Sequence, residues 1–492
     1  MLEFTWSYVK KHSNVFLLLV FSSLMAAVAE LMEPYITAKF IDEILTSGDK
    51  DKFYTFILIM AVICISAIAL YRFSIIQSHQ IQIIIKNEVV KDLINHVHKL
   101  QSEFLFKTDM VYLSKRIDND TKDLISFAVT SIVDFCTNSA LLCMSVFLLC
   151  SIGVKWLAIF MIFLAVHALV YFSLKQRIFH LSIAVRESES RYFTAFSDNF
   201  LYVYSIKLHS LYSEYVEKFL SMFRKYFEAE NKEIKLRFWF ERSYLNINKM
   251  CIVIIFFAGG KDVLEGSMTL GNFVALSGYY MLAMSGVAYF MSIGQGYQTA
   301  SAAYTRINEI RSLPIETNGT KKLAHVNSIE VMNVDYDFGE RKIICGMTQV
   351  FQKGKIYCLT GKNGAGKSTL INLMCGLLHP VNGRIIYNGI NISEIDMISA
   401  RRKLISAVEQ KDFLKNDNLY GGERRKVSIS NALSKTSDVL IMDEPDNNLD
   451  AGNISELINN IIAGKENRIT IIISHDKRII SIADEIIDLS SK

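Results

Sequence analysis

Gly361-Lys362-Asn363-Gly364-Ala365-Gly366-Lys367-Ser368-Thr369 fits G-x-x-x-x-G-K-[ST], the pattern of a phosphate-binding P-loop. The apolar run 356–360 before it reads as a buried strand, and residues 370–374 continue as a helix. Glycines let such a loop wrap around phosphate oxygens, while its N–H groups and the helix N-terminus carry partial positive charge. We therefore expect Lys367 to reach the β- and γ-phosphates of a nucleotide and Ser368 to ligate Mg²⁺. The alternative is a glycine-rich turn that arose by chance.

Short β-rich runs alternate with helical segments around this loop, which predicts an α/β domain. The predicted strands are 329–336, 355–360, 384–387, 404–409, 439–442, 469–473 and 485–489.

Four polar residues follow strands of this domain and are candidates for ATP chemistry. Asp443 ends an apolar strand, a pattern typical of Mg²⁺ binding, and Glu444 next to it is a candidate general base. His475 follows strand 469–473 and is expected at the γ-phosphate. Gln410 ends another strand and is expected at the metal or the attacking water. Each of these patterns is common when it occurs alone, and a lone histidine is more often structural. The P-loop followed by Gln410, the two glycines, Asp443-Glu444 and His475 on successive elements is a much more specific pattern.

The first 300 residues or so differ from this domain in their long apolar runs. Of the 492 residues, 51% are hydrophobic and 21% are charged, which is more apolar than an ordinary soluble protein. The net charge of +4 does not suggest a nucleic-acid partner. Long apolar runs predict six membrane-spanning helices, near 14–36, 54–76, 126–150, 154–174, 246–264 and 272–296.

Two long, more polar stretches lie between the spans, at 77–125 and 175–243. Their helical pattern predicts that the spans continue well beyond the bilayer, turn and come back. Because both stretches are rich in Lys and Arg, the positive-inside rule places them and the N-terminus in the cytosol.

Several polar residues fall within or near the spans, and two interpretations stay open for them. They either face a substrate cavity or occupy interfacial and interhelical positions. These residues are Glu30, Glu33, Asn138, Asn246, Asn248 and Lys249.

A break follows the last helical pattern, at Leu313-Pro314 and the polar residues 316–320. We therefore predict a transmembrane domain over 1–312, a linker over 313–326 and a nucleotide-binding domain over 327–492.

On these motifs the second half resembles the ATPase domain of ABC transporters, and the whole chain resembles an ABC exporter half-transporter. Leu419-Tyr420-Gly421-Gly422-Glu423 stands where that family has its LSGGQ signature, and Asn447-Asn448-Leu449-Asp450 matches the D-loop. Phe338 stands where the family has an aromatic that stacks on adenine; the alternative is a strand-core aromatic. Residues 116–121 and 205–207 resemble segments of the two cytosolic loops of the family.

The resemblance implies a fold of six spans with long cytosolic helices, joined to an α/β P-loop domain in the cytosol. It implies a multi-pass protein of the cell membrane that binds ATP and Mg²⁺ and works as a homodimer or heterodimer. ATP binding and hydrolysis would drive export of a hydrophobic or amphipathic substrate, such as a bacteriocin-like peptide, a lipid or a drug-like compound.

Two features depart from the family pattern. Tyr420 follows Gln410 by ten positions, where the family normally has a helical subdomain of several tens of residues. Tyr420 also replaces the signature serine, and Arg425, Lys426, Ser430 and Asn431 depart from the usual run after it. We therefore expect slow ATP turnover, or a heterodimer whose partner supplies an intact signature.

A second function stays open because of the shortened domain: an ATP-binding membrane sensor or regulatory subunit with little transport of its own. Intact Lys367, Asp443, Glu444 and His475 argue against it. A soluble P-loop ATPase with an incidental anchor does not fit, because six spans exceed what anchoring needs.

Overall fold

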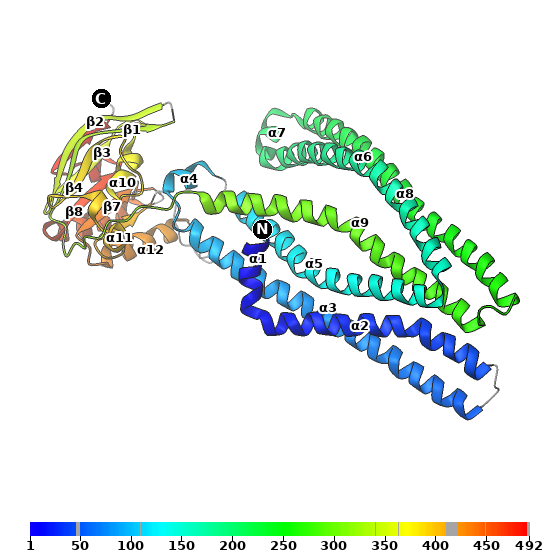
Figure 1. Cartoon of the computed structure of the whole chain (residues 1–492). Coiled ribbons are helices and arrows are strands. Elements are labelled where there is room, and N and C mark those ends of the chain that lie inside the picture. Colours follow the sequence, from blue (N-terminus) through cyan, green and yellow to red (C-terminus); the bar gives the residue numbers. More distant parts are fainter. Residues whose placement is uncertain are drawn as a thin grey trace. The chain divides into compact units, whose positions relative to one another are not determined.

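The computed structural model describes residues 1–45, 50–108, 110–339, 341–362, 364–409, 421–447 and 449–489. The chain divides into two compact units (Figure 1). Unit 1 comprises Met1–Asp92 and Ile117–Asn308, and unit 2 comprises Leu93–Arg116 and Glu309–Lys492.

Long α-helices build unit 1, and three of them extend into unit 2 at one end. The helices are α1 (Leu2–Val9), α2 (Ser13–Lys39), α3 (Lys50–Val97), α5 (Met110–Ile152), α6 (Val154–Leu201), α7 (Val203–His209), α8 (Tyr212–Leu264) and α9 (Leu270–Ser312). The predicted continuation of the spans through 77–97 and 175–201, with a turn and a return, is confirmed.

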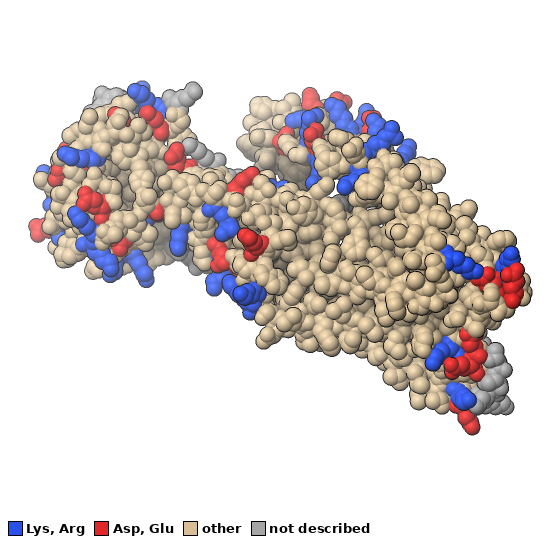
Figure 2. Space-filling model, in the orientation of Figure 1, with Lys and Arg blue, Asp and Glu red and all other residues tan. Residues whose placement is uncertain are grey.

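Five helical segments of the described chain are long and apolar enough to cross a membrane: Leu2–Ile44, Asp51–Val97, Tyr112–Ile152, Val154–Leu201 and Leu270–Ser312. The remaining predicted span, 246–264, is the C-terminal part of α8 and is less apolar because it contains Lys249, Lys261 and Asp262. Asp262 pairs with Lys155 at the start of α6. Figure 2 shows a wide surface of unit 1 with few charged side chains between charged groups at its ends.

An ion pair with a nearly buried carboxylate and a half-exposed guanidinium joins α5 and α9 in unit 1. Asp120, only 5% exposed, accepts hydrogen bonds from the guanidinium of Arg306 on α9, one of them 2.9 Å long. Asp120 belongs to the 116–121 segment, so this part of the family resemblance corresponds to a structural tie between α5 and α9.

Unit 2 contains two sheets, and its α/β character is as predicted. An antiparallel sheet has the order β2-β1-β4-β5, and a parallel sheet has the order β6-β7-β8-β3-β9. The strands are β1 (Ser328–Phe338), β2 (Arg341–Gln352), β3 (Ile356–Thr360), β4 (Asn382–Tyr387), β5 (Ile390–Asn391), β6 (Ile405–Val408), β7 (Val439–Asp443), β8 (Ile469–Ile473) and β9 (Glu485–Asp488). The helices are α4 (Ser102–Lys107), α10 (Lys367–Met374), α11 (Met397–Lys403), α12 (Gly421–Ser434), α13 (Ala451–Ala463) and α14 (Lys477–Ile480).

The parallel sheet determines where the candidate residues meet. β8 lies between β3 and β7 and pairs with both in parallel. Because the carboxyl ends of parallel strands share one edge, the P-loop after β3, Asp443 and Glu444 at β7 and His475 after β8 come to the same side. The apolar strands β3, β7 and β8 are buried on both faces, as expected for a central parallel sheet.

The turn between α3 and α5, described over residues 98–108, belongs with unit 2 and contacts the start of the predicted linker. Leu100 forms an antiparallel bridge with Ile315. The Gln101 N–H donates to the Pro314 carbonyl at 3.2 Å, and the Glu316 N–H donates to the Lys99 carbonyl at 2.6 Å. We call this contact the loop–linker bridge.

The loop–linker bridge continues toward α10, the helix of the P-loop pattern. Arg401 on α11 donates to the Glu316 carboxylate at 2.5 Å and to the Cys375 carbonyl at 3.3 Å. Cys375 is the C-cap of α10, the helix that starts at Lys367. Contacts therefore run from the turn between α3 and α5 to the far end of the P-loop helix.

Candidate nucleotide-binding site

The P-loop turns around three glycines that use backbone conformations unfavourable for other residues. Gly361, Gly364 and Gly366 have φ values of 142°, 83° and 94°. A side chain at Gly366 would also meet Ile343 at 3.0 Å. Glycine is therefore required here both for conformation and for close packing against β2.

Lys367 points back into the curve of this loop. It is 8% exposed, and its Nζ donates to the Gly361 carbonyl at 2.6 Å and to the Lys362 carbonyl at 3.3 Å. Ala365 donates its N–H to the same Lys362 carbonyl at 3.1 Å, and Thr369 lies in the first turn of α10. The ammonium is thus held at the centre of the loop, where the pattern G-x-x-x-x-G-K places phosphate.

Ser368 and Asp443 come together from two different elements. The Ser368 hydroxyl donates to Oδ2 of Asp443 at 3.0 Å. Burial raises the pKa of the Asp443 carboxyl, and the hydrogen bond from Ser368 opposes that rise. The pair brings one hydroxyl and one carboxylate to a single point at the edge of the sheet.

This donor set fits Mg²⁺ bound jointly with a nucleotide. Within the described ranges, no cluster of three or more His, Cys, Asp or Glu side chains could hold a metal by itself. Mg²⁺ typically takes one or two protein oxygens and completes its octahedron with phosphate oxygens and water. Ser368 and Asp443 meet that requirement; Gln410, the third predicted ligand, lies outside the described residues.

Glu444 is held in a strained backbone conformation next to this pair. Its φ of 48° lies in the left-handed region, which costs a non-glycine residue about 1–3 kcal/mol. Its N–H donates to the Ile473 carbonyl at 2.8 Å, and Asn447 donates to its Oε2 at 2.7 Å. Surrounding hydrogen bonds thus fix the direction of the carboxylate that the sequence predicts as general base.

Three more predicted residues lie on separate elements of unit 2. His475 is exposed directly after Ser474, whose buried hydroxyl donates to Asp446 at 2.7 Å. Phe338 ends β1 and is 41% exposed, so the alternative of a buried strand-core aromatic does not describe it. Asp450 accepts the Asn453 N–H at 2.8 Å and caps α13.

The signature prediction is only partly covered by the structure. Gly421 and Gly422 begin α12, and Glu423 is exposed in its first turn. Tyr420 and Asn363, like Gln410, lie outside the described residues. The connection from β6 to α12 consists of residues 409–420.

Arg425 is a residue to which the sequence pattern assigns no role. It is 2% exposed on α12 and donates to the Asp443 and Glu444 carbonyls at 2.7 Å each. The only signal in the sequence is its spacing from Ile429 and Ala432, which places it on the buried face of an amphipathic helix.

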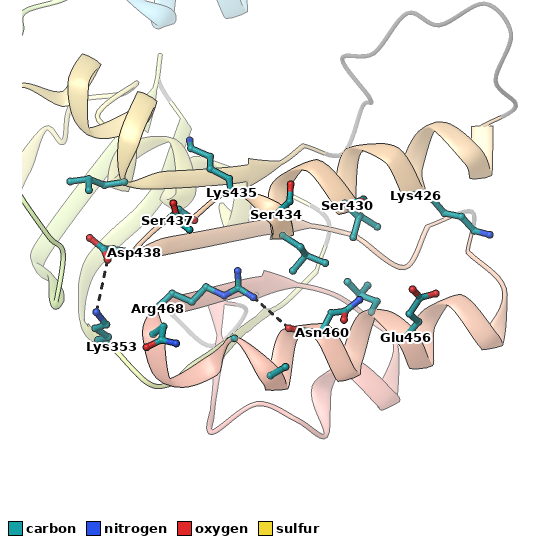
Figure 3. A pocket seen from close by; sticks show the side chains of 18 of the residues that line it. Lys353, Lys426, Ser430, Ser434, Lys435, Ser437, Asp438, Glu456, Asn460 and Arg468 are labelled. Carbon is teal, nitrogen blue, oxygen red and sulfur yellow. Dashed lines mark hydrogen bonds and ion pairs between the residues drawn. The ribbon is translucent and has the colours of Figure 1, made fainter.

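A groove of about 1010 Å³ lies between α12 and α13, and it is separate from the nucleotide site (Figure 3). Lys426, Ser430 and Ser434 line it from α12, and Glu456 and Asn460 from α13. Its described lining contains neither P-loop residues nor Asp443 and Glu444.

Two family models match the chain. The model of the ABC transporter transmembrane region matches residues 16–287, and the ABC transporter model matches residues 346–420. A bacterial Atm1-family ABC exporter with ATP bound has a similar fold, with a TM-score of 0.82 and 17% identity over 97% of this chain and 94% of that chain.

Curated relatives are similar at low identity. The mycobactin import ATP-binding/permease protein IrtB of Mycolicibacterium thermoresistibile is 24% identical over 48% of this chain and 50% of its own length. The chain thus spans about half the length of this first relative. An ATP-dependent lipid A-core flippase of Desulfotalea psychrophila is 22% identical over 95% of this chain and 91% of its own length.

Proposed function

We propose that this protein is an ATP-driven membrane exporter, because the chain belongs to the ABC transporter family. It joins an ABC transporter transmembrane region to an ABC transporter ATPase segment. Its five long apolar helices and its fold make it a multi-pass membrane protein. The domain boundaries at 312 and 327, and the cytosolic side of unit 2 and the N-terminus, are part of the proposal.

The observation that carries the proposal is the Ser368–Asp443 hydrogen bond of 3.0 Å. It joins the first turn of α10, the helix that follows β3, to the end of β7, across β8, at the edge of the parallel sheet where α10 begins and β7 ends. This is the arrangement that phosphoryl transfer to water needs: a phosphate cradle, a metal-binding pair and an adjacent carboxylate.

Each residue then has a defined role. The P-loop amides and Lys367 hold the phosphates, Ser368, Asp443 and Gln410 hold Mg²⁺, and Phe338 stacks on adenine. Glu444 accepts the proton of the attacking water, and His475 contacts the γ-phosphate. When bound by these residues, Mg²⁺ would supply positive charge against the charge that develops on the phosphate oxygens.

We propose that two chains form the working transporter, either two copies or this chain with a related one. The turn around α7 at the end of the α6–α8 hairpin supports this, because Leu201, Tyr204 and Leu208 are 75%, 76% and 65% exposed. Large apolar side chains in such a patch favour a protein partner. In the dimer, the signature residues 420–423 and Asp450 face the nucleotide of the partner.

The substrate class follows from similarity alone. A relative named for lipid A-core flipping supports a lipid or another amphipathic molecule, and a bacteriocin-like peptide or a drug-like compound stays open. The alternative function is a regulatory subunit that binds ATP without driving transport. The short connection 409–420 and Tyr420 favour it, because both weaken the route from the signature to the membrane helices.

Hydrolysis by the full chain in lipid vesicles tests the proposal. We expect slow MgATP turnover that Lys367→Ala abolishes and that Glu444→Gln lowers to a small residual rate, with MgATP binding lost only in Lys367→Ala. Vesicles that contain a fluorescent phospholipid, or that are offered a labelled cationic amphipathic peptide, then report transport. ATP binding and turnover without ATP-dependent movement of either probe would favour the regulatory subunit, and absence of MgATP binding would refute both functions.

A further inference from the structure

Arg425 places a cation in the interior of unit 2 beside the proposed active site. Its side chain is 2% exposed. Nη1 donates to the Glu409 carbonyl just after β6, and Nη2 donates to the Asp443 and Glu444 carbonyls at 2.7 Å each. One guanidinium thus ties together the carboxyl ends of two neighbouring strands, β6 and β7.

A buried cation at this position has no obvious advantage for folding alone. Arg425, Ile429 and Ala432 follow one another on the inward face of α12, where the other two are apolar core residues. On the adjoining face of α12, Lys426, Ser430 and Ser434 line the groove of Figure 3. An apolar residue would pack at position 425 without the desolvation cost of a charge. The contacts that the guanidinium makes therefore indicate a role other than filling the core.

Those contacts hold the backbone of Glu444, the proposed general base, whose carboxylate must point at the attacking water. Glu444 is held at a φ of 48°, and Arg425 binds its carbonyl while Ile473 accepts its N–H. The backbone of Glu444 is thus fixed on both sides. Without the guanidinium, relaxation toward an ordinary conformation would turn the carboxylate away from its present position.

The same residue is close to the signature end of α12. The helix begins at Gly421, so Arg425 lies about one turn, or roughly 6 Å along the axis, from the residue that matches the family signature. A helix of this length moves as a rigid body over one turn. Displacement of its N-terminus is therefore transmitted to the Asp443 and Glu444 carbonyls.

We infer that Arg425 is a positioning residue, which fixes the backbone of Glu444 and lets the signature end of α12 set the direction of that carboxylate. The inference rests on the proposed ATPase function and adds a specific link between the signature of this chain and its own general base.

The test compares Arg425→Lys with wild type in single-turnover MgATP hydrolysis by the full chain in lipid vesicles. A lysine keeps the charge, but its single ammonium cannot span the carbonyls that the forked guanidinium joins. We expect the single-turnover rate constant to fall on the order of 10- to 100-fold, since small displacements of a catalytic group lower reaction rates by that factor. The MgATP dissociation constant stays within about twofold, because the P-loop is untouched. Lys426→Arg, a change of the same size on the exposed face, serves as the matched control and retains wild-type turnover.

A double-mutant cycle separates positioning from general loss of structure. In a Glu444→Gln background, Arg425→Lys should cause no further loss of the residual rate, because its effect passes through Glu444. Arg425→Gln, which keeps a donor without the charge, provides a second variant if the lysine variant does not fold.

The outcomes distinguish the inference from the proposed function. Wild-type turnover in both Arg425 variants overturns the inference and leaves the ATPase function intact. Parallel loss of MgATP affinity, thermal stability and kcat overturns it as well, because a purely structural role would produce that result. An inactive wild type that binds no MgATP refutes the proposed function, and the inference falls with it.

Discussion

Removing the Glu316 charge should loosen the loop–linker bridge. Glu316→Gln keeps the size of the side chain but breaks its ion pair with Arg401. The Glu316 side chain is only 16% exposed and the Arg401 side chain 22%. A hydrogen bond between charged groups of this kind contributes about 1.5–3 kcal/mol, and exposed pairs contribute less than about 1 kcal/mol. For this half-buried pair we expect a loss of about 1–2 kcal/mol, a 5- to 30-fold change in a local opening equilibrium.

Amide hydrogen exchange of the full chain measures that opening directly. The Gln101 and Glu316 amides donate across the bridge, so both are protected in the wild type. In Glu316→Gln we expect both amides, or the peptides that contain them, to exchange about 5- to 30-fold faster. Amides of β3 and β8 in the core of the same unit should be unchanged.

Glu394→Gln is the matched control. Glu394 pairs with Lys321 at 2.6 Å in the same unit, but the two side chains are 52% and 56% exposed. The same chemical change should there alter exchange by less than about threefold, because exposed ion pairs are weak. An equal effect of the two variants, or acceleration spread over the whole of unit 2, would refute the assignment of the bridge to the Glu316–Arg401 pair.

Three further changes are predicted to affect stability, measured by chemical or thermal unfolding in detergent. Gly383→Ala should lower the free energy of unfolding by more than about 2 kcal/mol, because φ is +81° and the new methyl would lie 2.2 Å from a backbone carbonyl oxygen of β1. Gly389→Ala is the control: it has the same φ but open space around it, and should lower the free energy of unfolding by only about 1 kcal/mol. Arg306→Leu should cost about 1–3 kcal/mol of unfolding free energy, because Asp120 is nearly buried but Arg306 is 42% exposed and partly screened by water, and a matching Asp120→Asn change should recover part of that loss. Hydrogen bonds from a backbone N–H and an asparagine lower the pKa of Asp335, so its contribution is present above the unfolded pKa of about 3.9 and is lost as pH falls through the lower folded pKa. Asp335→Asn should therefore destabilise at pH 7 and have a smaller effect at pH 3.

The sequence predicts the local elements well where a pattern is strong. The P-loop, the apolar strands β3, β7 and β8, and the long helices of unit 1 were all expected from periodicity or motif, and the structure confirms them as elements. β2 is not predicted because Gly346, with a φ of 56°, and shifts in pairing register interrupt its alternation. A strand of this kind is specified by its neighbour β1 rather than by its own sequence.

Long-range contacts could not be read from the sequence for a similar reason. The Ser368–Asp443 pair was expected, because the motif links a serine and a strand-end carboxylate through one metal. Arg425 and the Glu316–Arg401 pair carry no such motif, since an arginine in a helix usually faces solvent. Only the packing of α12 and α11 against the sheet shows that these side chains point inward.

The loop–linker bridge has a consequence for how the chain is made on the ribosome. Leu100 finds its strand partner at Ile315, more than two hundred residues later in the chain. At about 5–20 residues per second, the turn between α3 and α5 emerges roughly 10–40 s before that partner is synthesised. During that interval its neighbours are still being threaded into the bilayer, so a fragment that begins at the linker would lack a piece of the ATPase unit from the start.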